Sequence, residues 1–283
     1  MPLFSVIIPT YNAGRDLDRC LASLAAQTYK DFEVIVADDG STDDTKKIAE
    51  SYRDRLTLIY KWEENWGGPA RPRNRGIKLA RAEWICFLDQ DDWWYPNKLE
   101  TCALHVNSAD IIYHDLDIYS GVSSKPLRGL RSRQLTDDPF TDLMLNGNAL
   151  FTSATVVKKA ILQQVDGMAE DKTLVTLEDY DCWLKIARIT KKFLYIPESL
   201  GAYSQGAGLF GSLKHVDSPE ALWRRNVGYL RTPEERKLAT SIMKFNQARM
   251  YHNNKRYGRA FVLYCEAGPT FLVNRLIRRF RPK

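Results

Sequence analysis

The first 115 residues alternate short, almost continuous apolar runs with amphipathic stretches. The apolar runs occupy residues 4–9, 32–37, 56–60, 84–88 and 110–114. Between the first two runs, Leu17, Leu21 and Leu24 recur at the spacing of one helical face. Strands that are apolar throughout are buried on both faces, and strands separated by helices pair in parallel. The alternation therefore predicts an α/β fold with a mostly parallel sheet that is flanked by helices.

Polar segments follow three of the predicted strands. "TYN" begins at Thr10, "DDG" at Asp38 and "DQDD" at Asp89. Ligands of parallel α/β sheets bind beyond the carboxyl ends of the strands. We therefore expect these segments to lie together and to form one site at that edge of the sheet.

The stretch "FLDQDDWW" sets Asp89, Asp91 and Asp92 directly after an apolar run. Neighbouring carboxylates repel one another and lose hydration at a strand end, so a bound cation or proton is the simplest explanation for such a cluster. Asp is also common in turns, and a solvated acidic turn is the alternative. The convergence of polar segments on one edge favours the cation site.

The second half of the chain has a different pattern. Residues 121–139 are polar and basic, which indicates a loop or a switch between two halves of a domain. The run "ALFTSATVV" and the segment "TLEDYDCWLKIA" follow, and beyond Tyr203 the pattern is wholly helical. Pro219 and Pro233 stand at positions typical of helix starts, and Thr232 and Glu235 have the spacing of a capping box. In the first half of the chain, Ser41 and Asp44 have the same capping-box spacing.

Charge is distributed unevenly along the chain. Residues 221–283 contain 15 Lys and Arg against 3 Asp and Glu, a net charge of +12, whereas residues 1–220 carry −6. The end of the chain, "FLVNRLIRRFRPK", has the spacing of a basic amphipathic helix that lies on an anionic membrane surface. A helix whose apolar side packs on the rest of the protein is the alternative. No nucleic-acid-binding motif is found, so we expect no nucleic-acid partner.

Several classes of protein are excluded by what the sequence lacks. No apolar run is long enough to span a membrane and no secretory leader precedes the first strand, so we expect a cytoplasmic protein. The five cysteines have no C-x-x-C pair and are expected to be reduced core residues. Neither a G-x-G-x-x-G after the first strand nor a P-loop motif is present, which excludes the familiar dinucleotide and P-loop sites.

The segment "NWGGPARPRNRG" supplies the groups that a diphosphate would need. Gly67 and Gly68 permit close approach of the backbone, and Arg71, Arg73 and Arg75 offer guanidinium groups. A metal ion and guanidinium groups together suit a diphosphate leaving group, whose developing charge they neutralise. A merely solvated basic loop is the alternative.

Four segments in this order, "SVIIPTYN", "VIVADDGSTDDT", "NRGIKLARAEWICFLDQDDWWYPNKL" and "LEDYDCWL", resemble glycosyltransferase family 2. Members of that family are inverting enzymes of the GT-A fold that use nucleotide-sugars. The resemblance covers roughly residues 3–205. It implies a catalytic domain at 1–205, with a nucleotide-binding half at about 1–115 and an acceptor half at about 116–205, followed by a basic helical extension at 206–283.

The resemblance also implies roles for residues on the donor side. Pro9, Thr10 and Tyr11 would line the nucleobase pocket, with Tyr11 stacked on the base, although Tyr11 could instead pack under its own loop. Asp39 would accept a hydrogen bond from a uracil-like base, or it could cap a helix that begins near Ser41.

Asp89 and Asp91 match the D-x-D motif of the family. Asp91 would bind Mn²⁺ or Mg²⁺ directly, and Asp89 would lie nearer the ribose or the waters of the metal ion. Asp92 matches a less decisive position and could be structural. Arg73 is the arginine expected at the diphosphate, and the choice between Arg71 and Arg73 stays open.

On the acceptor side, Asp179 would be the general base and Glu178 would orient it or the acceptor. Asp181 lies two residues further on, so on a helix it points away from Asp179 and only one of the two reaches the acceptor. Trp93 and Trp94 could stack on sugar faces, or they could pack in the core.

The resemblance thus implies an inverting transferase that moves a sugar from a UDP- or dTDP-sugar to a hydroxyl of a glycan or lipid-linked glycan. Synthesis of a bacterial-type surface polysaccharide such as O-antigen is the expected setting, in the cytoplasm or at the inner face of the plasma membrane. A non-catalytic nucleotide- or glycan-binding relative and a metal-dependent phosphohydrolase are the alternatives.

Overall fold

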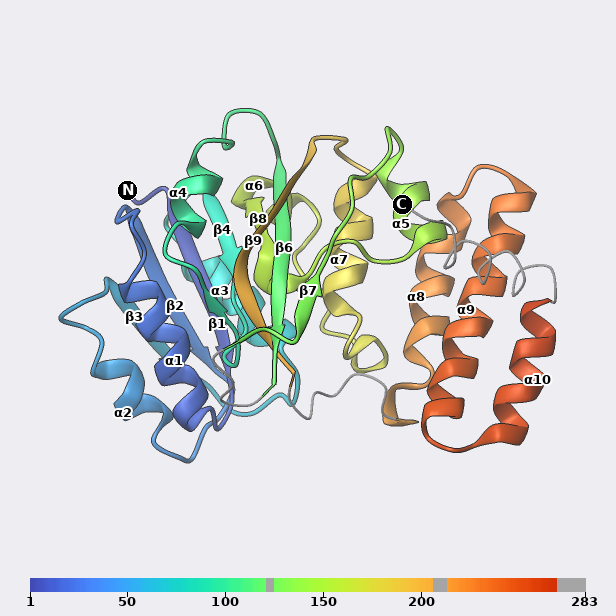
Figure 1. Ribbon diagram of the computed structural model, residues 1–283, viewed down its shortest axis with the longest axis horizontal. Helices are drawn as coiled ribbons and strands as arrows, with labels where there is room; N and C mark the ends of the chain where they lie inside the picture. Colours follow the sequence, from blue (N-terminus) through green and yellow to red (C-terminus); the bar gives the residue numbers. More distant parts are fainter. Residues whose placement is uncertain (121–124, 206–212, 269–283) are drawn as a thin grey trace.

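The computed structural model describes residues 1–120, 125–205 and 213–268 (Figure 1). One sheet runs through the centre of the molecule in the order β3-β2-β1-β4-β8-β6-β9-β5, with β7 paired to β6. The strands are β1 Phe4–Thr10, β2 Phe32–Asp38, β3 Leu58–Trp62, β4 Trp84–Phe87, β5 Trp93–Trp94, β6 Ile111–Tyr119, β7 Arg128–Leu130, β8 Thr155–Lys158 and β9 Phe193–Ser204. This arrangement confirms the predicted α/β class.

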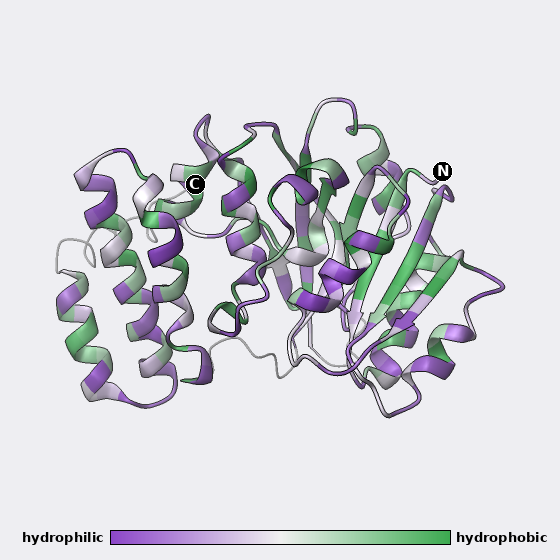
Figure 2. Ribbon diagram, turned by 180° about the vertical axis from the view of Figure 1, so that it is seen from behind, coloured by the Kyte–Doolittle hydropathy of each residue, from purple (hydrophilic) through white to green (hydrophobic). Residues whose placement is uncertain are grey.

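Helices cover both faces of the sheet. They are α1 Gly14–Ala25, α2 Thr45–Glu50, α3 Ala70–Leu79, α4 Lys98–Ala103, α5 Pro139–Asn146, α6 Lys159–Gln164, α7 Glu178–Ala187, α8 Ser218–Asn226, α9 Pro233–Asn253 and α10 Tyr257–Ala267, with short 3₁₀ turns η1 Thr152–Ala154, η2 Lys172–Leu174, η3 Leu213–His215 and η4 Val227–Tyr229. Ile7 of β1 faces the core shared with α3 and α7, whereas Val6 and Ile8 face the core shared with α1 and α4. The inner strands β1, β2 and β4 are largely apolar because both of their faces are buried, and Figure 2 colours strands of this half mostly green.

The sheet is parallel in one half and mixed in the other. β1 pairs in parallel with β2 and β4, and β2 pairs in parallel with β3. In contrast, β8 is antiparallel to both β4 and β6, and β5 is antiparallel to β9. The second half also contains one parallel pair, β6 with β9, so this half is mixed whereas the first half is wholly parallel. An apolar strand pattern carries no information about strand direction.

Every described element beyond β9 is helical. At α9 the Thr232 hydroxyl accepts a hydrogen bond from the Glu235 amide at 3.1 Å, and the Glu235 carboxylate accepts one from the Thr232 amide at 3.0 Å, which confirms the predicted capping box. The division at 205/206 stays a prediction. The predicted basic helix within 271–283 lies outside the described residues. Among the helices that are described, none has the length and apolar character needed to cross a membrane.

Two local expectations are corrected by the structure. Ser41 does not cap α2: its hydroxyl accepts from the Asn12 amide at 2.8 Å, and Asp43 accepts from the Thr45 amide at 3.0 Å instead. All five cysteines are free and four are buried, but Cys265 is exposed on α10. Cys265 lies on the side of α10 opposite to the buried residues Ala260, Leu263 and Ala267.

Candidate active site

The three polar segments lie side by side at the carboxyl edge of the sheet, which is the lower edge in Figure 1. The Gln90 side-chain oxygen accepts from the Thr10 hydroxyl and from the Tyr11 amide, each at 2.8 Å. The Asn12 side chain accepts from the Thr42 amide at 3.0 Å. These bonds join the segments that follow β1, β2 and β4 into one surface, as the strand pattern predicted.

Asp39 is buried behind this surface and organises the loop that precedes α3. Its two carboxylate oxygens accept from the amides of Trp66 at 3.1 Å and Gly67 at 3.0 Å. Its main-chain oxygen accepts from the Asn65 side chain at 2.7 Å. Asp39 thus does not cap α2, and its proposed contact with a nucleobase stays a prediction. Tyr11 is 50% exposed, so it does not pack beneath its own loop.

The three aspartates after β4 have different surroundings. Asp92 is buried and accepts from the Ser153 hydroxyl at 2.5 Å and the Ser204 amide at 2.9 Å, so it holds the loop in place. The carboxylate of Asp91 is partly exposed and receives no hydrogen bond or ion pair from another residue within the described part of the chain. Burial, and then the charge of Asp89, raise the pKa of Asp91 to about 6.

Arg73 connects this acidic loop to the start of α7. It donates to Asp89 Oδ1 at 2.6 Å and to Glu178 Oε1 at 2.7 Å, and its side chain is 4% exposed. Burial alone would lower the pKa of Arg73, but the carboxylates of Asp89 and Glu178 raise it above the usual value. Both terminal nitrogens therefore bind protein carboxylates, which differs from the expected guanidinium turned toward a diphosphate.

Arg71 lies closer to the surface than Arg73. Its Nε donates to Glu170 at 2.8 Å, its side chain is 45% exposed, and its guanidinium lies 5.2 Å from the ring centre of Trp66. Arg71 is thus the more accessible of the two arginines, and the contact of either with a diphosphate stays a prediction.

The predicted base motif occupies the first turn of α7. Asp179 Oδ2 accepts from the Thr152 hydroxyl and Oδ1 from the Tyr180 amide, each at 2.6 Å. Burial raises the pKa of Asp179, and the Thr152 hydrogen bond and the charge of Arg73 oppose that rise. Burial likewise raises the pKa of Glu178, against the charge of Arg73.

Asp181 is turned away from this first turn. Its Oδ1 accepts from Arg225 Nε and from the Asn226 side chain of α8, each at 3.2 Å. Asp181 therefore ties α7 to the helices that follow the sheet. Only Asp179 of the two is near the acidic loop, which agrees with the expectation from helical geometry.

The two adjacent tryptophans have different environments. Trp94 is 2% exposed, its indole N–H donates to the Ser153 carbonyl at 2.7 Å, and Lys98 Nζ lies 3.5 Å from its ring centre. The hypothesis that Trp94 stacks on an acceptor sugar is therefore wrong, because the ring is in the core. Trp93 is partly exposed, with its ring centre 4.9 Å from that of Tyr119, and its contact with an acceptor stays a prediction.

Sequence reasoning missed the hydroxyls of η1. Thr152 contacts Asp179, and Ser153 contacts Asp92 and accepts from the Asp89 amide at 3.1 Å. The sequence-based predictions assign no role to the run "ALFTSATVV". Two neighbouring hydroxyls inside it were the signal that could have identified a polar turn.

The acidic loop fits a metal site that the donor helps to complete. Within the described residues, no group of three or more His, Cys, Asp and Glu could hold a metal ion alone. Mg²⁺ in such enzymes is usually held by one or two carboxylates together with substrate phosphates and waters. Asp91, whose carboxylate has no partner in the part of the chain that the structure describes, and Asp89 suit that kind of site.

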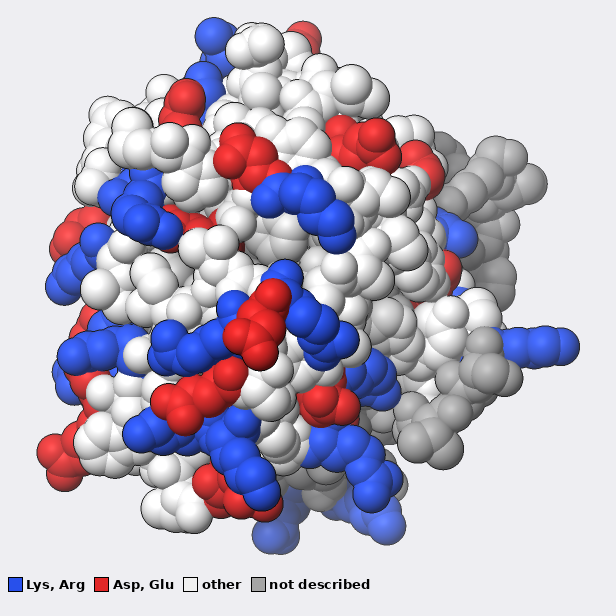
Figure 3. Space-filling view, turned by 90° about the vertical axis from the view of Figure 1, so that its left-hand side faces the viewer, with Lys and Arg blue, Asp and Glu red and all other residues white. Residues whose placement is uncertain are grey.

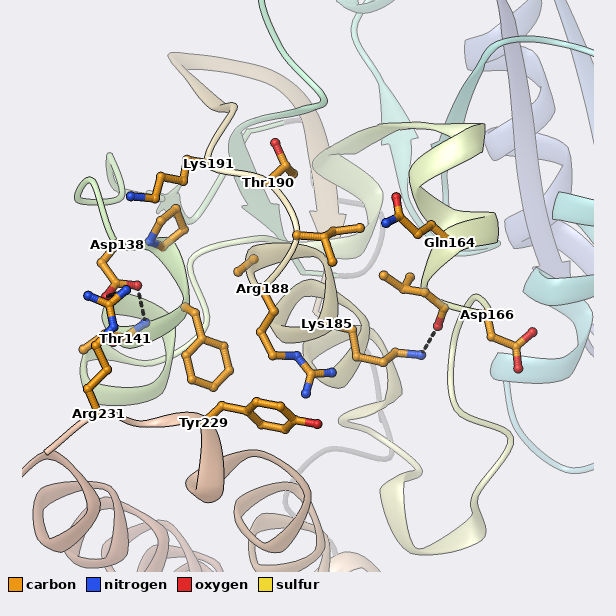
Figure 4. A pocket seen from close by; sticks show the side chains of 15 residues that line it. Asp138, Thr141, Gln164, Asp166, Lys185, Arg188, Thr190, Lys191, Tyr229 and Arg231 are labelled. Atoms are coloured by element: carbon orange, nitrogen blue, oxygen red, sulfur yellow. Dashed lines mark hydrogen bonds and ion pairs between the residues drawn. The ribbon is translucent and has the colours of Figure 1, made fainter. Parts of the chain in front are cut away.

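A cavity of about 760 Å³ lies elsewhere, at the carboxyl end of α7 (Figure 4). Lys185, Arg188 and Tyr229 are among the residues that line it, and none of the predicted site residues does. It is therefore separate from the edge where Asp91 and Asp179 lie. The candidate site is therefore identified from the hydrogen bonds and ion pairs among its residues, and not from this cavity.

Comparison with known proteins identifies the family of this chain. The family model described as glycosyl transferase family 2 matches residues 5–165. An uncharacterized glycosyltransferase of Rickettsia typhi is 33% identical over 230 residues, which cover 78% of this chain and 70% of the relative. The poly(ribitol-phosphate) beta-N-acetylglucosaminyltransferase TarS of Staphylococcus aureus is 32% identical over 188 residues, which cover 63% of this chain but only 31% of TarS.

Solved structures show the same fold. TarS 1–349 in complex with UDP-GlcNAc superposes with a TM-score of 0.67 at 22% identity, covering 96% of this chain and 80% of that structure. A mannosyltransferase of Pyrobaculum calidifontis in complex with GDP-Man and Mn²⁺ gives 0.64 at 15% identity, covering 99% and 81%. The GT-A fold is thereby confirmed. The match to the family model over more than half of the chain shows that this protein is a member of glycosyl transferase family 2.

Proposed function

We propose that this protein transfers a sugar from a UDP-sugar, or alternatively a dTDP-sugar, to a hydroxyl of a glycan acceptor with inversion at the anomeric carbon. The observation that carries this proposal is the bridge made by Arg73, which brings Asp89 of the D-x-D motif and Glu178 of the base motif to one guanidinium. The UDP-GlcNAc complex of TarS supports a uridine nucleotide as the first donor to test.

Asp91, with Asp89 beside it, would hold Mn²⁺ or Mg²⁺ against the donor diphosphate. When bound, such an ion neutralises the charge that develops on the leaving diphosphate. The mannosyltransferase complex with Mn²⁺ supports the use of a divalent ion. Tyr11 is exposed where a nucleobase could stack on it, and Pro9, Thr10 and Asp39 would form the rest of that pocket.

Asp179 would take the proton of the acceptor hydroxyl. As the new bond from that oxygen to the anomeric carbon forms on one face, the bond to the diphosphate oxygen breaks on the other, which inverts the configuration. A carboxylate whose pKa is raised by burial is a stronger base than a solvated one. Glu178, held by Arg73, would fix the start of α7 or orient the acceptor.

Product analysis distinguishes this proposal from its alternatives. The protein would be incubated with UDP-, dTDP- and GDP-sugars, with and without Mn²⁺ and a glycan acceptor. Thermal unfolding of the same mixtures shows which donor binds: a donor at 100 times its dissociation constant should add about 2.7 kcal/mol to the free energy of unfolding. The products then distinguish the three functions. A transferase releases the nucleoside diphosphate and forms a glycoside, a phosphohydrolase releases phosphate without an acceptor, and a non-catalytic relative binds the donor without turnover.

We also propose that the basic end of the chain attaches the protein to an anionic membrane surface, where a lipid-linked glycan or a growing surface polysaccharide would be the acceptor. The net charge of +12 on residues 221–283 supports this. On the face over α1, α2 and β3, by contrast, Lys and Arg are interspersed with Asp and Glu (Figure 3). That mixed face offers no comparable excess of one sign.

A further inference from the structure

The turn η1 contacts both acidic motifs through two consecutive hydroxyls. Thr152 Oγ1 donates to Asp179 Oδ2 at 2.6 Å, and Ser153 Oγ donates to Asp92 Oδ2 at 2.5 Å. Both residues are buried, with Thr152 9% and Ser153 2% exposed. The turn runs directly into β8, which pairs with β4 and β6 in the middle of the sheet. The two hydroxyls therefore lie at the start of a strand that is paired on both sides in the middle of the sheet.

We propose that Thr152 is the positioning residue of the general base, an inference that rests on the proposed role of Asp179. The Tyr180 amide and the Thr152 hydroxyl each bind one oxygen of the Asp179 carboxylate, and together they fix its rotation. Each oxygen keeps a second lone pair for the acceptor proton. Threonine suits this role because branching at Cβ restricts χ1 and directs the hydroxyl.

The Thr152 hydroxyl also lowers the pKa of Asp179, which burial raises, and it does so without adding a charge. The charged groups near Asp179 come from three elements: Arg73 from α3, Asp89 from the loop after β4, and Glu178 from α7 itself. Arg73 stabilises the ionised form of Asp179, whereas Asp89 disfavours it. Arg73 is already shared between two other carboxylates. The hydrogen bond from Thr152 therefore favours the ionised form of Asp179.

Thr152→Val tests this role because it removes the hydroxyl and keeps the shape. We expect kcat to fall about 10- to 100-fold, below the range for loss of a base, with the donor KM nearly unchanged. Without the hydrogen bond the pKa of Asp179 rises further, so the acid limb of the kcat/KM profile should move to higher pH. Thr152→Ser, which retains the hydroxyl, should restore both kcat and the profile.

The chain offers a matched control at Thr190. Its hydroxyl donates to Asp110 Oδ2 at 2.6 Å, the same pair of residue types at the same distance as Thr152 and Asp179. The Thr190 hydroxyl also accepts from the Lys192 amide at 3.1 Å, so Thr190→Val should lower the melting temperature. It should leave kcat and the pH profile as they are.

A titration of the Asp179 carboxyl by ¹³C NMR gives a readout that does not depend on activity. The signal is assigned by its absence in Asp179→Asn. The titration should move to higher pH in Thr152→Val and return in Thr152→Ser. An unchanged titration in folded Thr152→Val, or a fall in kcat that Thr152→Ser does not restore, would overturn the inference. Full turnover of Asp179→Asn would instead refute the assigned base, while the titration still shows whether Thr152 controls that carboxyl.

Discussion

The loop after β4 and the first turn of α7 both gather carboxylates, but their hydrogen bonding differs. At α7, Arg73 binds Glu178, and Thr152 and the Tyr180 amide bind Asp179. In the loop, Asp91 has no such partner among the described residues. Buried or crowded carboxylates that lack donors are costly unless a cation joins them. We therefore propose that the protein alone would prepare Asp179 as a base, whereas a metal ion and the donor would complete the loop.

Replacing Asp91, whose carboxylate has no partner among the described residues, should have the largest effect on sugar transfer. Asp91→Asn substitutes a neutral oxygen for an anionic ligand, so we expect transfer from the UDP-sugar to fall below detection at any Mn²⁺ concentration. The rate of sugar transfer is measured by the release of UDP in the presence of acceptor. Wild-type turnover in Asp91→Asn would mean that the loop does not bind the catalytic metal.

Loss of the base should come next. Asp179→Asn should lower kcat by about 10²- to 10⁴-fold. Asp181→Asn is the control on the same helix: it should lower stability, because Arg225 and Asn226 lose their acceptor, and leave kcat nearly unchanged. An inactive Asp181→Asn beside an active Asp179→Asn would reverse the assignment.

The bridge between the two regions can be broken at Arg73. Arg73→Met leaves buried Glu178 without its cation, which should cost about 3–5 kcal/mol in the free energy of unfolding. Arg71→Met, which removes an ion pair with a 45% exposed side chain, should cost no more than about 1 kcal/mol. Urea unfolding of both variants measures the difference. Equal losses would show that the bridge is no more than a surface contact.

The first-half elements were predictable because their signals are local. The first strand was expected at 4–9 and is found at Phe4–Thr10, and Leu17, Leu21 and Leu24 are all buried. Runs of apolar residues and helical spacing reflect burial of neighbouring residues, so a short window reveals them.

The contacts that build the site were not predictable in the same way. Arg73 and Glu178 are 105 residues apart, and Thr152 and Asp179 are 27 apart. Tertiary packing brings these pairs together, and no periodicity marks them. The placement of Arg73 between two carboxylates followed only from the structure, and for Trp94 the structure decided between sugar stacking and core packing.

The contrast between the two regions also predicts an effect of pH on stability. A rise in the pKa of Asp91 from 3.8 to about 6 corresponds to at most about 3 kcal/mol of destabilisation when it is ionised. Without metal, Asp91→Asn should therefore be more stable than wild type above pH 6. The advantage should shrink as the pH falls through 6 toward 4, where wild-type Asp91 becomes protonated. Thermal unfolding of both proteins in EDTA across this pH range tests the prediction. A stability difference between Asp91→Asn and wild type that does not change with pH would contradict it.

The last variant concerns the end of the chain and should leave the site itself unaffected. Five basic residues beyond Thr270 contribute at most roughly 5 kcal/mol to binding an anionic membrane surface. The full chain should therefore sediment with anionic vesicles at low salt and be released at high salt, and a chain that ends at Thr270 should bind less. Equal sedimentation of both, or binding that ignores salt and lipid charge, would rule out electrostatic attachment.

The most direct test measures donor binding separately from turnover. Calorimetric titration of UDP-GlcNAc, with and without Mn²⁺, would be carried out on wild type, Asp91→Asn and Asp179→Asn. We predict that Mn²⁺ strengthens binding to wild type and to Asp179→Asn alike and has no effect on Asp91→Asn. Loss of the Mn²⁺ effect in Asp179→Asn, or its persistence in Asp91→Asn, would contradict the division of roles between the acidic loop and α7.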